Sequence, residues 1–165
     1  MKILVFSDTH GRTDKMYDII SRKKSAELVI HLGDCCSDLE SVRDSFPEKA
    51  FLGVRGNCDF FRTEDYPEFR TVTLEGHTFF MSHGHMYGVK GVSSFDTLAY
   101  TAVSKGAQTA LFGHTHKSLY KTVGGVTLFN PGSLEEPRDL KGPSYGMITI
   151  ENGKCVFEII NDLKL

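Results

Sequence analysis

The sequence contains 165 residues, 40% of them hydrophobic and 24% charged, with a formal net charge of −2 at pH 7. This length and composition are typical of one soluble globular domain that buries its own core, and we treat residues 1–165 as a single domain. The near-neutral charge gives no electrostatic basis for binding long nucleic acid or an anionic membrane surface, so neither is expected as a partner.

The apolar N-terminus and the cysteines do not indicate export. The N-terminal apolar run, Ile3–Phe6, has four residues and is too short for a signal peptide or a membrane span. The four cysteines form no C-x-x-C pair, and two of them are adjacent, which indicates neither a zinc ribbon nor a disulfide framework. We therefore expect a cytoplasmic protein with reduced thiols.

The first half of the chain alternates between strand-like and helix-like patterns. Residues 2–8 predict a strand buried on both faces. A helix is expected from Thr13, because Met16 and Ile20 share one face and Thr13 or Asp14 is a suitable N-cap.

The same order then repeats. Residues 27–34 predict a second strand and residues 50–57 a third. Between them, residues 37–40 have the form of a capping box, and Leu39 and Val42 begin the apolar stripe of a second helix. A β-α-β-α-β order predicts a parallel sheet.

The second half is richer in hairpin signals. Residues 69–74 and 77–83 predict a hairpin, and a helical stripe runs from Phe95 to Val103. Five further strands are expected, at residues 109–114, 118–123, 126–130, 145–150 and 155–160. We predict an α/β fold of two packed sheets with helices outside, one sheet mostly parallel at its start and the other richer in antiparallel pairs.

Polar side chains able to bind a metal follow five of the predicted strands. They are Asp8, Asp34, Asn57, His83 and His114. His10 and His116 each stand two residues beyond one of these positions, so five of the seven histidines fall in the segments D-T-H, H-G-H and H-T-H. Because ligands of open α/β sheets bind beyond the carboxyl ends of strands, we expect these side chains to converge.

The donor set consists of four imidazoles, two carboxylates and one amide oxygen. Nitrogen and oxygen ligands of this kind suit manganese, iron, nickel, cobalt or zinc. Seven ligands are too many for one tetrahedral ion but fit two ions that share a carboxylate, about 3.5–4 Å apart as in metal-assisted phosphoester cleavage. Each residue alone is better explained as a cap, a turn residue or a buried histidine. The five coincidences together favour a metal site.

These segments resemble the signature of the calcineurin-like metallophosphoesterases, and in particular their small, YfcE-type phosphodiesterase branch. The matching motifs are D-T-H at residues 8–10, G-D at 33–34, G-N-C-D at 56–59, H-G-H at 83–85 and G-H-T-H at 113–116. The resemblance runs from residue 7 to about residue 133 and includes the segment N-P-G-S at 130–133.

The resemblance implies a four-layer α-β-β-α sandwich of two mixed sheets and a binuclear metal centre. One ion would be held by Asp8, His10 and His116, and the other by Asn57, His83 and His114. Asp34 would bridge them. The catalytic set implied by the family comprises Asp34, Asn57, Cys58 and His83. Mn²⁺ or Ni²⁺ is favoured, with iron, cobalt and zinc left open.

Cys58 departs from the family motif, where a histidine is thought to protonate the leaving group. Cys58 is either a small filler near the site or a weak proton donor, since a thiol of pKa about 8.5 is mostly protonated at neutral pH. Asp59 is either a turn residue or a residue that orients a ligand histidine, and the role of His85 stays open. Lys90 and Arg138 are either phosphate-binding cations or solvated surface charges.

The expected reaction is hydrolysis of a small phosphate ester, most naturally a diester, by attack of a metal-bridging hydroxide. A phosphomonoesterase using the same site is one alternative. Another is a scaffold module of the same fold that has lost catalysis, as in a retromer subunit. The sequence does not name the natural substrate, and it leaves open whether the chain forms a homo-oligomer.

Overall fold

Two five-stranded sheets pack face to face in the computed structural model, which describes residues 1–60, 65–91 and 95–161. The first sheet has the order β10 (Lys154–Asn161), β9 (Ser144–Glu151), β1 (Lys2–Phe6), β2 (Leu28–His31), β3 (Ala50–Gly53). The second has the order β4 (Phe69–Leu74), β5 (His77–Ser82), β6 (Thr109–Leu111), β8 (Val126–Pro131), β7 (Ser118–Val123).

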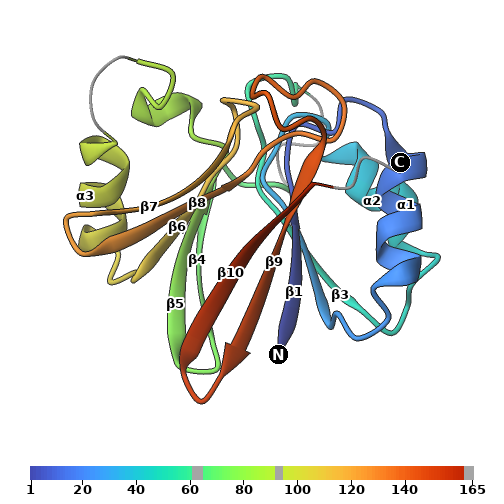
Figure 1. The fold of residues 1–165 in the computed structure, drawn as a ribbon, viewed down its shortest axis with the longest axis horizontal. Coiled ribbons are helices and arrows are strands. Elements are labelled where there is room, and N and C mark those ends of the chain that lie inside the picture. The colour runs from blue at the N-terminus through green and yellow to red at the C-terminus, as the bar shows by residue number, and fades with distance from the viewer. Residues whose placement is uncertain (61–64, 92–94, 162–165) are drawn as a thin grey trace.

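Helices cover the outer face of each sheet (Figure 1). Helices α1 (Thr13–Arg22) and α2 (Ser37–Arg43) lie on the first sheet, and α3 (Asp96–Ser104) lies on the second. A short 3₁₀ turn, η1 (His85–Tyr87), follows β5. The layers run helix, sheet, sheet, helix, as the predicted four-layer α-β-β-α sandwich requires. No helix in the described ranges is long and apolar enough to cross a bilayer.

The two sheets have the same mixture of pairings, so the predicted contrast between them is wrong. In the first sheet β1–β2 and β2–β3 are parallel, whereas β1–β9 and β9–β10 are antiparallel. In the second, β5–β6 and β6–β8 are parallel, whereas β4–β5 and β7–β8 are antiparallel. The C-terminal hairpin joins the first sheet because β9 pairs with β1, with Lys2 opposite Thr149.

The predicted N-caps of the first two helices are wrong in detail. Arg12 stands at the N-cap of α1 and Cys36 at that of α2, and neither side chain makes a capping hydrogen bond. Ser37 is the first residue inside α2, so it cannot serve as the cap of a capping box. The N-terminal amides before α2 find another partner, described below.

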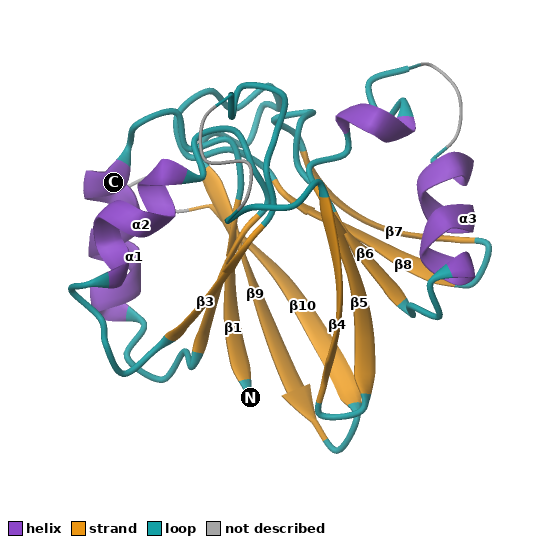
Figure 2. Cartoon of the chain, turned by 180° about the vertical axis from the view of Figure 1, so that it is seen from behind, coloured by secondary structure: helices purple, strands orange, loops and turns teal. Residues whose placement is uncertain are grey.

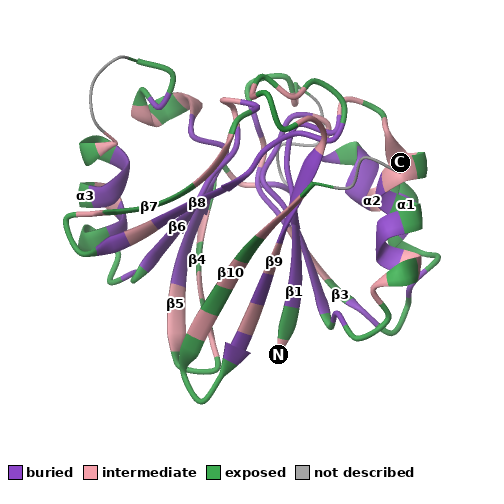
Figure 3. Cartoon of the chain, in the orientation of Figure 1, coloured by how far each residue is buried: buried purple, intermediate pink, exposed green. Residues whose placement is uncertain are grey.

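Three apolar layers result from strand alternation, and burial follows them (Figure 3). Ile3 and Val5 of β1 face the second sheet, where they pack in one cluster with Phe79 and Met81 of β5. Their neighbours on β1 face α1 and α2, and a third cluster joins the second sheet to α3. The parallel strands of both sheets end at one edge of the sandwich, where the long connecting loops gather (Figure 2).

Candidate metal centre

The loops at this edge bend sharply at the predicted ligands. Positive φ angles of 53°, 45°, 58°, 65° and 56° occur at Asp8, His10, Asp34, His114 and His116. Each left-handed residue other than glycine costs about 1–3 kcal/mol, and such strain gathers at functional sites. Five of the seven predicted ligands therefore adopt a backbone conformation that ordinary loop residues avoid.

One group of potential ligand atoms comes from Asp8, His10, Asp34 and His116. All four donors lie within 4.8 Å of one another. His116 Nε2 is 3.1 Å from Asp8 Oδ1, and the rings of His10 and His116 are 5.2 Å apart. The first three residues follow strands of the first sheet and His116 follows β6 of the second, so the group spans both sheets.

A second group comes from Asp34, His83 and His114, again with donors within 4.8 Å of one another. His83 Nε2 lies 3.3 Å from Asp34 Oδ2 and 3.2 Å from His114 Nδ1. Asp34 belongs to both groups, which is the position that the resemblance implies for a bridging carboxylate.

Backbone carbonyls fix the orientation of two of the histidines. His83 Nδ1 lies 2.8 Å from the carbonyl of Leu32, and His116 Nδ1 lies 2.8 Å from the carbonyl of Glu136. A carbonyl only accepts, so each Nδ1 carries the proton and donates it. In the neutral ring this leaves Nε2 with a free lone pair directed at the carboxylates, the usual arrangement of a metal-binding histidine.

The donor geometry fits divalent cations. Two ligands that each lie about 2.0–2.1 Å from one ion are separated by about 3 Å, close to the His83–His114 and Asp8–His116 spacings. Among the described residues, His10 Nε2 and Asp8 Oδ1 are also buried without a hydrogen-bond partner. Buried polar atoms normally have a partner, and a cation at this point would supply one.

Charge coupling perturbs the titration of these groups. Burial favours the neutral form of His83, but its contact with Asp34 and the charge of Asp8 raise the His83 pKa above its ordinary value. Contact with Asp8 likewise outweighs burial and raises the pKa of His116. Burial is also outweighed at the carboxyl groups, where the same histidines lower the pKa of Asp8 and of Asp34. The electrostatic coupling therefore favours the ionised carboxylates and, relative to an ordinary histidine, the protonated forms of His83 and His116.

Asn57 and Cys58 are the most exposed members of the predicted set. The Asn57 amide nitrogen donates to Cys58 Sγ over 3.3 Å, so its side chain faces Cys58 in this structure. The backbone N–H of Cys58 donates to Asp34 Oδ1 over 2.9 Å. Burial, followed by the charge of Asp34, raises the pKa of Cys58 to about 11, so the thiol is protonated at neutral pH and is a weaker acid than an ordinary cysteine.

Asp59, for which the sequence left open a turn position or a role in orienting a ligand histidine, binds backbone N–H groups of two loops. Its carboxylate accepts backbone N–H bonds from Asp34, Cys35 and Cys36, each 2.9 Å, and from Gly56, 2.7 Å. Within the described residues, its carboxylate makes no hydrogen bond to a predicted ligand histidine. It ties the Asp34 loop to the loop of Asn57 and satisfies the amides that precede α2. The aspartate of G-N-C-D is therefore a loop anchor.

A buried polar network supports the D-T-H segment. The Thr9 hydroxyl donates to Asp38 Oδ2 over 2.6 Å and lies 2.9 Å from His31 Nε2. Asp38 also accepts the N–H of Gly11 over 2.9 Å. The sequence analysis did not predict these contacts, because the two partners on the second strand and the second helix belong to no recognised motif. The threonine between two predicted ligands was the signal that could have indicated a supporting hydrogen bond.

Glycine at two motif positions allows the loops to approach. A Cβ at Gly113 would collide with the hydroxyl of Ser7 and one at Gly56 with the carboxylate of Asp34. Ser7 donates to Asp8 Oδ2 over 2.6 Å, and the same oxygen accepts the N–H of His114 over 3.0 Å. The glycine of G-H-T-H thus permits direct contact between the two sheets at the site, and the glycine of G-N-C-D permits close approach of two loops that follow strands of the first sheet. His85 lies beside this region, its ring 5.5 Å from that of His83.

Residues 1–153 match the model of the calcineurin-like phosphoesterase superfamily domain. The chain is 33% identical over 153 residues to the probable metallophosphoesterase YsnB of Bacillus subtilis, covering 92% of this chain and 86% of that protein. It is 27% identical over 172 residues to the phosphodiesterase YfcE of Escherichia coli, covering 90% and 87%. The structure of Vps29 from Entamoeba histolytica complexed with Zn²⁺ shares the fold, with a TM-score of 0.70, 21% identity and coverage of 98% and 99%.

The chain therefore belongs to the calcineurin-like phosphoesterase superfamily. The match confirms the resemblance drawn from the five motifs, the α/β sandwich and the expectation of an enzyme of the metallophosphoesterase family. The two candidate donor groups are consistent with the metal dependence of this family.

Proposed function

We propose that residues 1–165 form one cytoplasmic catalytic domain that hydrolyses small phosphodiesters at a binuclear metal site. Asp8, His10 and His116 would hold one ion, and Asn57, His83 and His114 the other. The observation that carries the proposal is that Asp34 belongs to both donor groups. Manganese and nickel suit this mixed set of nitrogen and oxygen ligands. The relative YfcE, which is named a phosphodiesterase, aligns with this chain over most of the length of both proteins.

Two bound divalent ions would supply an activated water near neutral pH and positive charge for the phosphate oxygens. The residues of the chain prepare that site. His83 and His116 are held by backbone carbonyls, so their Nε2 atoms need no reorientation to bind. Asp59 holds the loops of Asp34 and Asn57 together.

The leaving group receives little help from protonation. Cys58 occupies the position at which the family carries a histidine, and its thiol, with a pKa raised to about 11, donates a proton poorly to a departing alkoxide. The proposed site therefore favours esters of acidic alcohols, such as phenols, over esters of simple alkanols. Diesters of this kind are the substrate class we propose.

The test is hydrolysis of bis-p-nitrophenyl phosphate by protein loaded with Mn²⁺ or Ni²⁺, with p-nitrophenyl phosphate as the monoester comparison. Asp34→Ala is expected to lose turnover and most bound metal. Asp44→Ala is the matched control, since Asp44 is an exposed aspartate at the end of α2. A fully active Asp34→Ala variant with wild-type metal content would reject the site, and a faster monoester reaction would favour a phosphomonoesterase.

A scaffold role is the second candidate, and the fold shared with Vps29 favours it. Metal content alone does not separate the two, because that Vps29 structure is itself a Zn²⁺ complex. Turnover does separate them. A metal-loaded protein that hydrolyses neither monoesters nor diesters would support the scaffold.

A further inference from the structure

A cavity of about 560 Å³ lies next to the candidate metal centre. Thr115 lines this cavity and stands between His114 and His116 in the chain. Arg138 also lines it, and its backbone N–H donates to the carbonyl of His116 over 2.8 Å. The cavity and the proposed metal site therefore share one loop.

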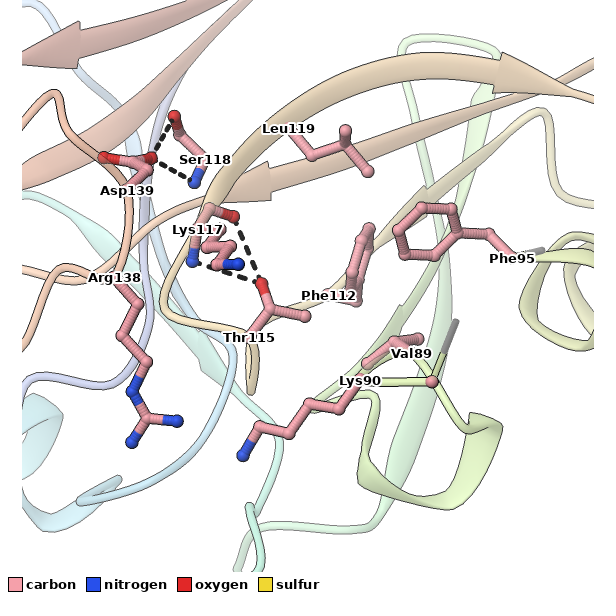
Figure 4. Close-up of a pocket in the computed structure, with 11 residues that line it drawn as sticks. Val89, Lys90, Phe95, Phe112, Thr115, Lys117, Ser118, Leu119, Arg138 and Asp139 are labelled. Atoms are coloured by element: carbon pink, nitrogen blue, oxygen red, sulfur yellow. Dashed lines mark hydrogen bonds between the residues drawn. The ribbon is translucent and has the colours of Figure 1, made fainter. Parts of the chain in front are cut away.

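One side of the cavity is apolar. Figure 4 shows the rings of Phe95 and Phe112 beside Leu119, with Val89 below them. The centroids of the two rings are 5.6 Å apart. Phe112 and Val89 are buried, and they belong with the apolar layer between the second sheet and α3. This wall is preformed and can receive a flat hydrocarbon group.

The other side is cationic and is formed by Lys90, Lys117 and Arg138. Lys90 and Arg138 extend toward the same side of the cavity in Figure 4, away from Leu119 and Phe95. The carboxylate of Asp139, which also lines the cavity, accepts the N–H and the hydroxyl of Ser118, both over 2.8 Å. Arg138 lies 3.9 Å from Glu136 at the surface. The cations outnumber the acids that line the cavity.

The cationic side of the cavity lies beside the proposed metal centre. Thr115, which stands between the two proposed ligands of its loop, lines the cavity, and the backbone N–H of Arg138 is bonded to the carbonyl of His116.

We infer that this cavity binds one ester arm of the substrate, an aromatic group that carries a further anionic substituent such as a carboxylate or a second phosphate. The inference rests on the proposed function, because it names the substrate class of the same site. The aromatic ring would contact Phe95 and Leu119, which are partly exposed in the cavity, and the anion would face Lys90 and Lys117.

The size and chemistry of the cavity carry this assignment. A volume of about 560 Å³ falls within the range of roughly 300–1,000 Å³ for small-molecule pockets. An arm as small as methyl would leave most of it filled with water. An uncharged arm would place no negative charge opposite these cations, whereas an anionic aryl arm satisfies both sides of the cavity.

The test uses four diesters that all release p-nitrophenolate, so that the bond cleaved is the same. Their second arms are methyl, phenyl, para-carboxyphenyl and para-phosphoryloxyphenyl. We expect kcat/KM to rise about tenfold from methyl to phenyl through ring burial, and about fivefold more with either anion. Comparison of the last two arms distinguishes a carboxylate from a phosphate ligand. Lys90→Glu should abolish the advantage of the anion but keep that of the ring.

Lys121→Glu is the matched control, because Lys121 is an exposed lysine of β7 outside the cavity. It should retain both preferences. Equal kcat/KM for the methyl and anionic aryl arms would overturn the inference, as would an anion preference that survives Lys90→Glu. Binding of para-carboxyphenyl phosphonate, which is not hydrolysed, is measured in parallel by calorimetry. Lys90-dependent binding without turnover of any diester would reject the proposed function and keep the cavity, whereas absence of such binding would reject the cavity.

Discussion

Replacing Asp59 by asparagine should weaken both the fold and the proposed metal site. The Asp59 carboxylate accepts four backbone N–H groups at 2.7–2.9 Å. An asparagine keeps one acceptor oxygen and turns an NH₂ group toward the remaining amides, so about two of the four bonds are lost. Hydrogen bonds to a charged group contribute about 1.5–3 kcal/mol each. Because Asp59 is only partly buried, we expect a total loss of about 2–3 kcal/mol.

In a chain of 165 residues this corresponds to a fall in Tm of roughly 5–10 °C. The assay is thermal unfolding of the chelator-treated protein, together with calorimetric titration of Mn²⁺. We expect a lower Tm and a metal affinity reduced by at least about tenfold, since supporting residues of metal sites commonly contribute that much. Asp44→Asn serves as the control. An Asp59→Asn protein with unchanged Tm and unchanged metal affinity would refute the loop-anchor role.

Three further predictions concern protons, leaving groups and buried polar contacts. Because their pKa values are raised in the metal-free fold, His83 and His116 add stability that is present below the unfolded pKa and is lost as pH rises through the folded pKa. Metal binding should therefore release more protons at pH 6 than at pH 9. Calorimetry in buffers of different ionisation enthalpy measures this release, and equal release at the two pH values would contradict the raised pKa values of the two histidines. Cys58→His should increase turnover of monoesters and alkyl esters relative to bis-p-nitrophenyl phosphate by about 10²-fold, the low end for general acid catalysis, and an unchanged ratio would show that this position does not limit proton donation. Thr9→Val should lower the free energy of unfolding by about 1–3 kcal/mol, because Asp38 and its buried partners lose a donor, and chemical denaturation measures the loss; a variant within about 0.5 kcal/mol of wild type would contradict it.

Local pattern was enough to locate the strand ends and hence the convergence of Asp8, Asp34 and His114. Each run of apolar residues ends where the strand leaves the sheet, and parallel pairing brings those ends to one edge. The placement of the C-terminal hairpin was not predictable in the same way. Its turn is encoded by Asn152 and Gly153, but its partner strand lies at the opposite end of the chain. Pairing over such a distance leaves no local signal.

The predicted N-caps were wrong for a related reason. Ser37 has the right type and spacing for a cap, but the carboxylate of Asp59 arrives from another loop and already binds the amides that precede α2. Tertiary contacts therefore replaced a local cap. The orientation of Asn57 is likewise set by a side-chain rotation toward Cys58, which sequence spacing does not specify.

Asp34 and the residues around it come from one half of the sandwich, whereas His83, His114 and His116 come from the other. Neither donor group is complete within a single sheet. A metal ion bound at the proposed centre would therefore link the two halves of the sandwich, and the chain could retain it at full strength only after those halves had docked. The ion would add to the apolar packing that already joins the two sheets.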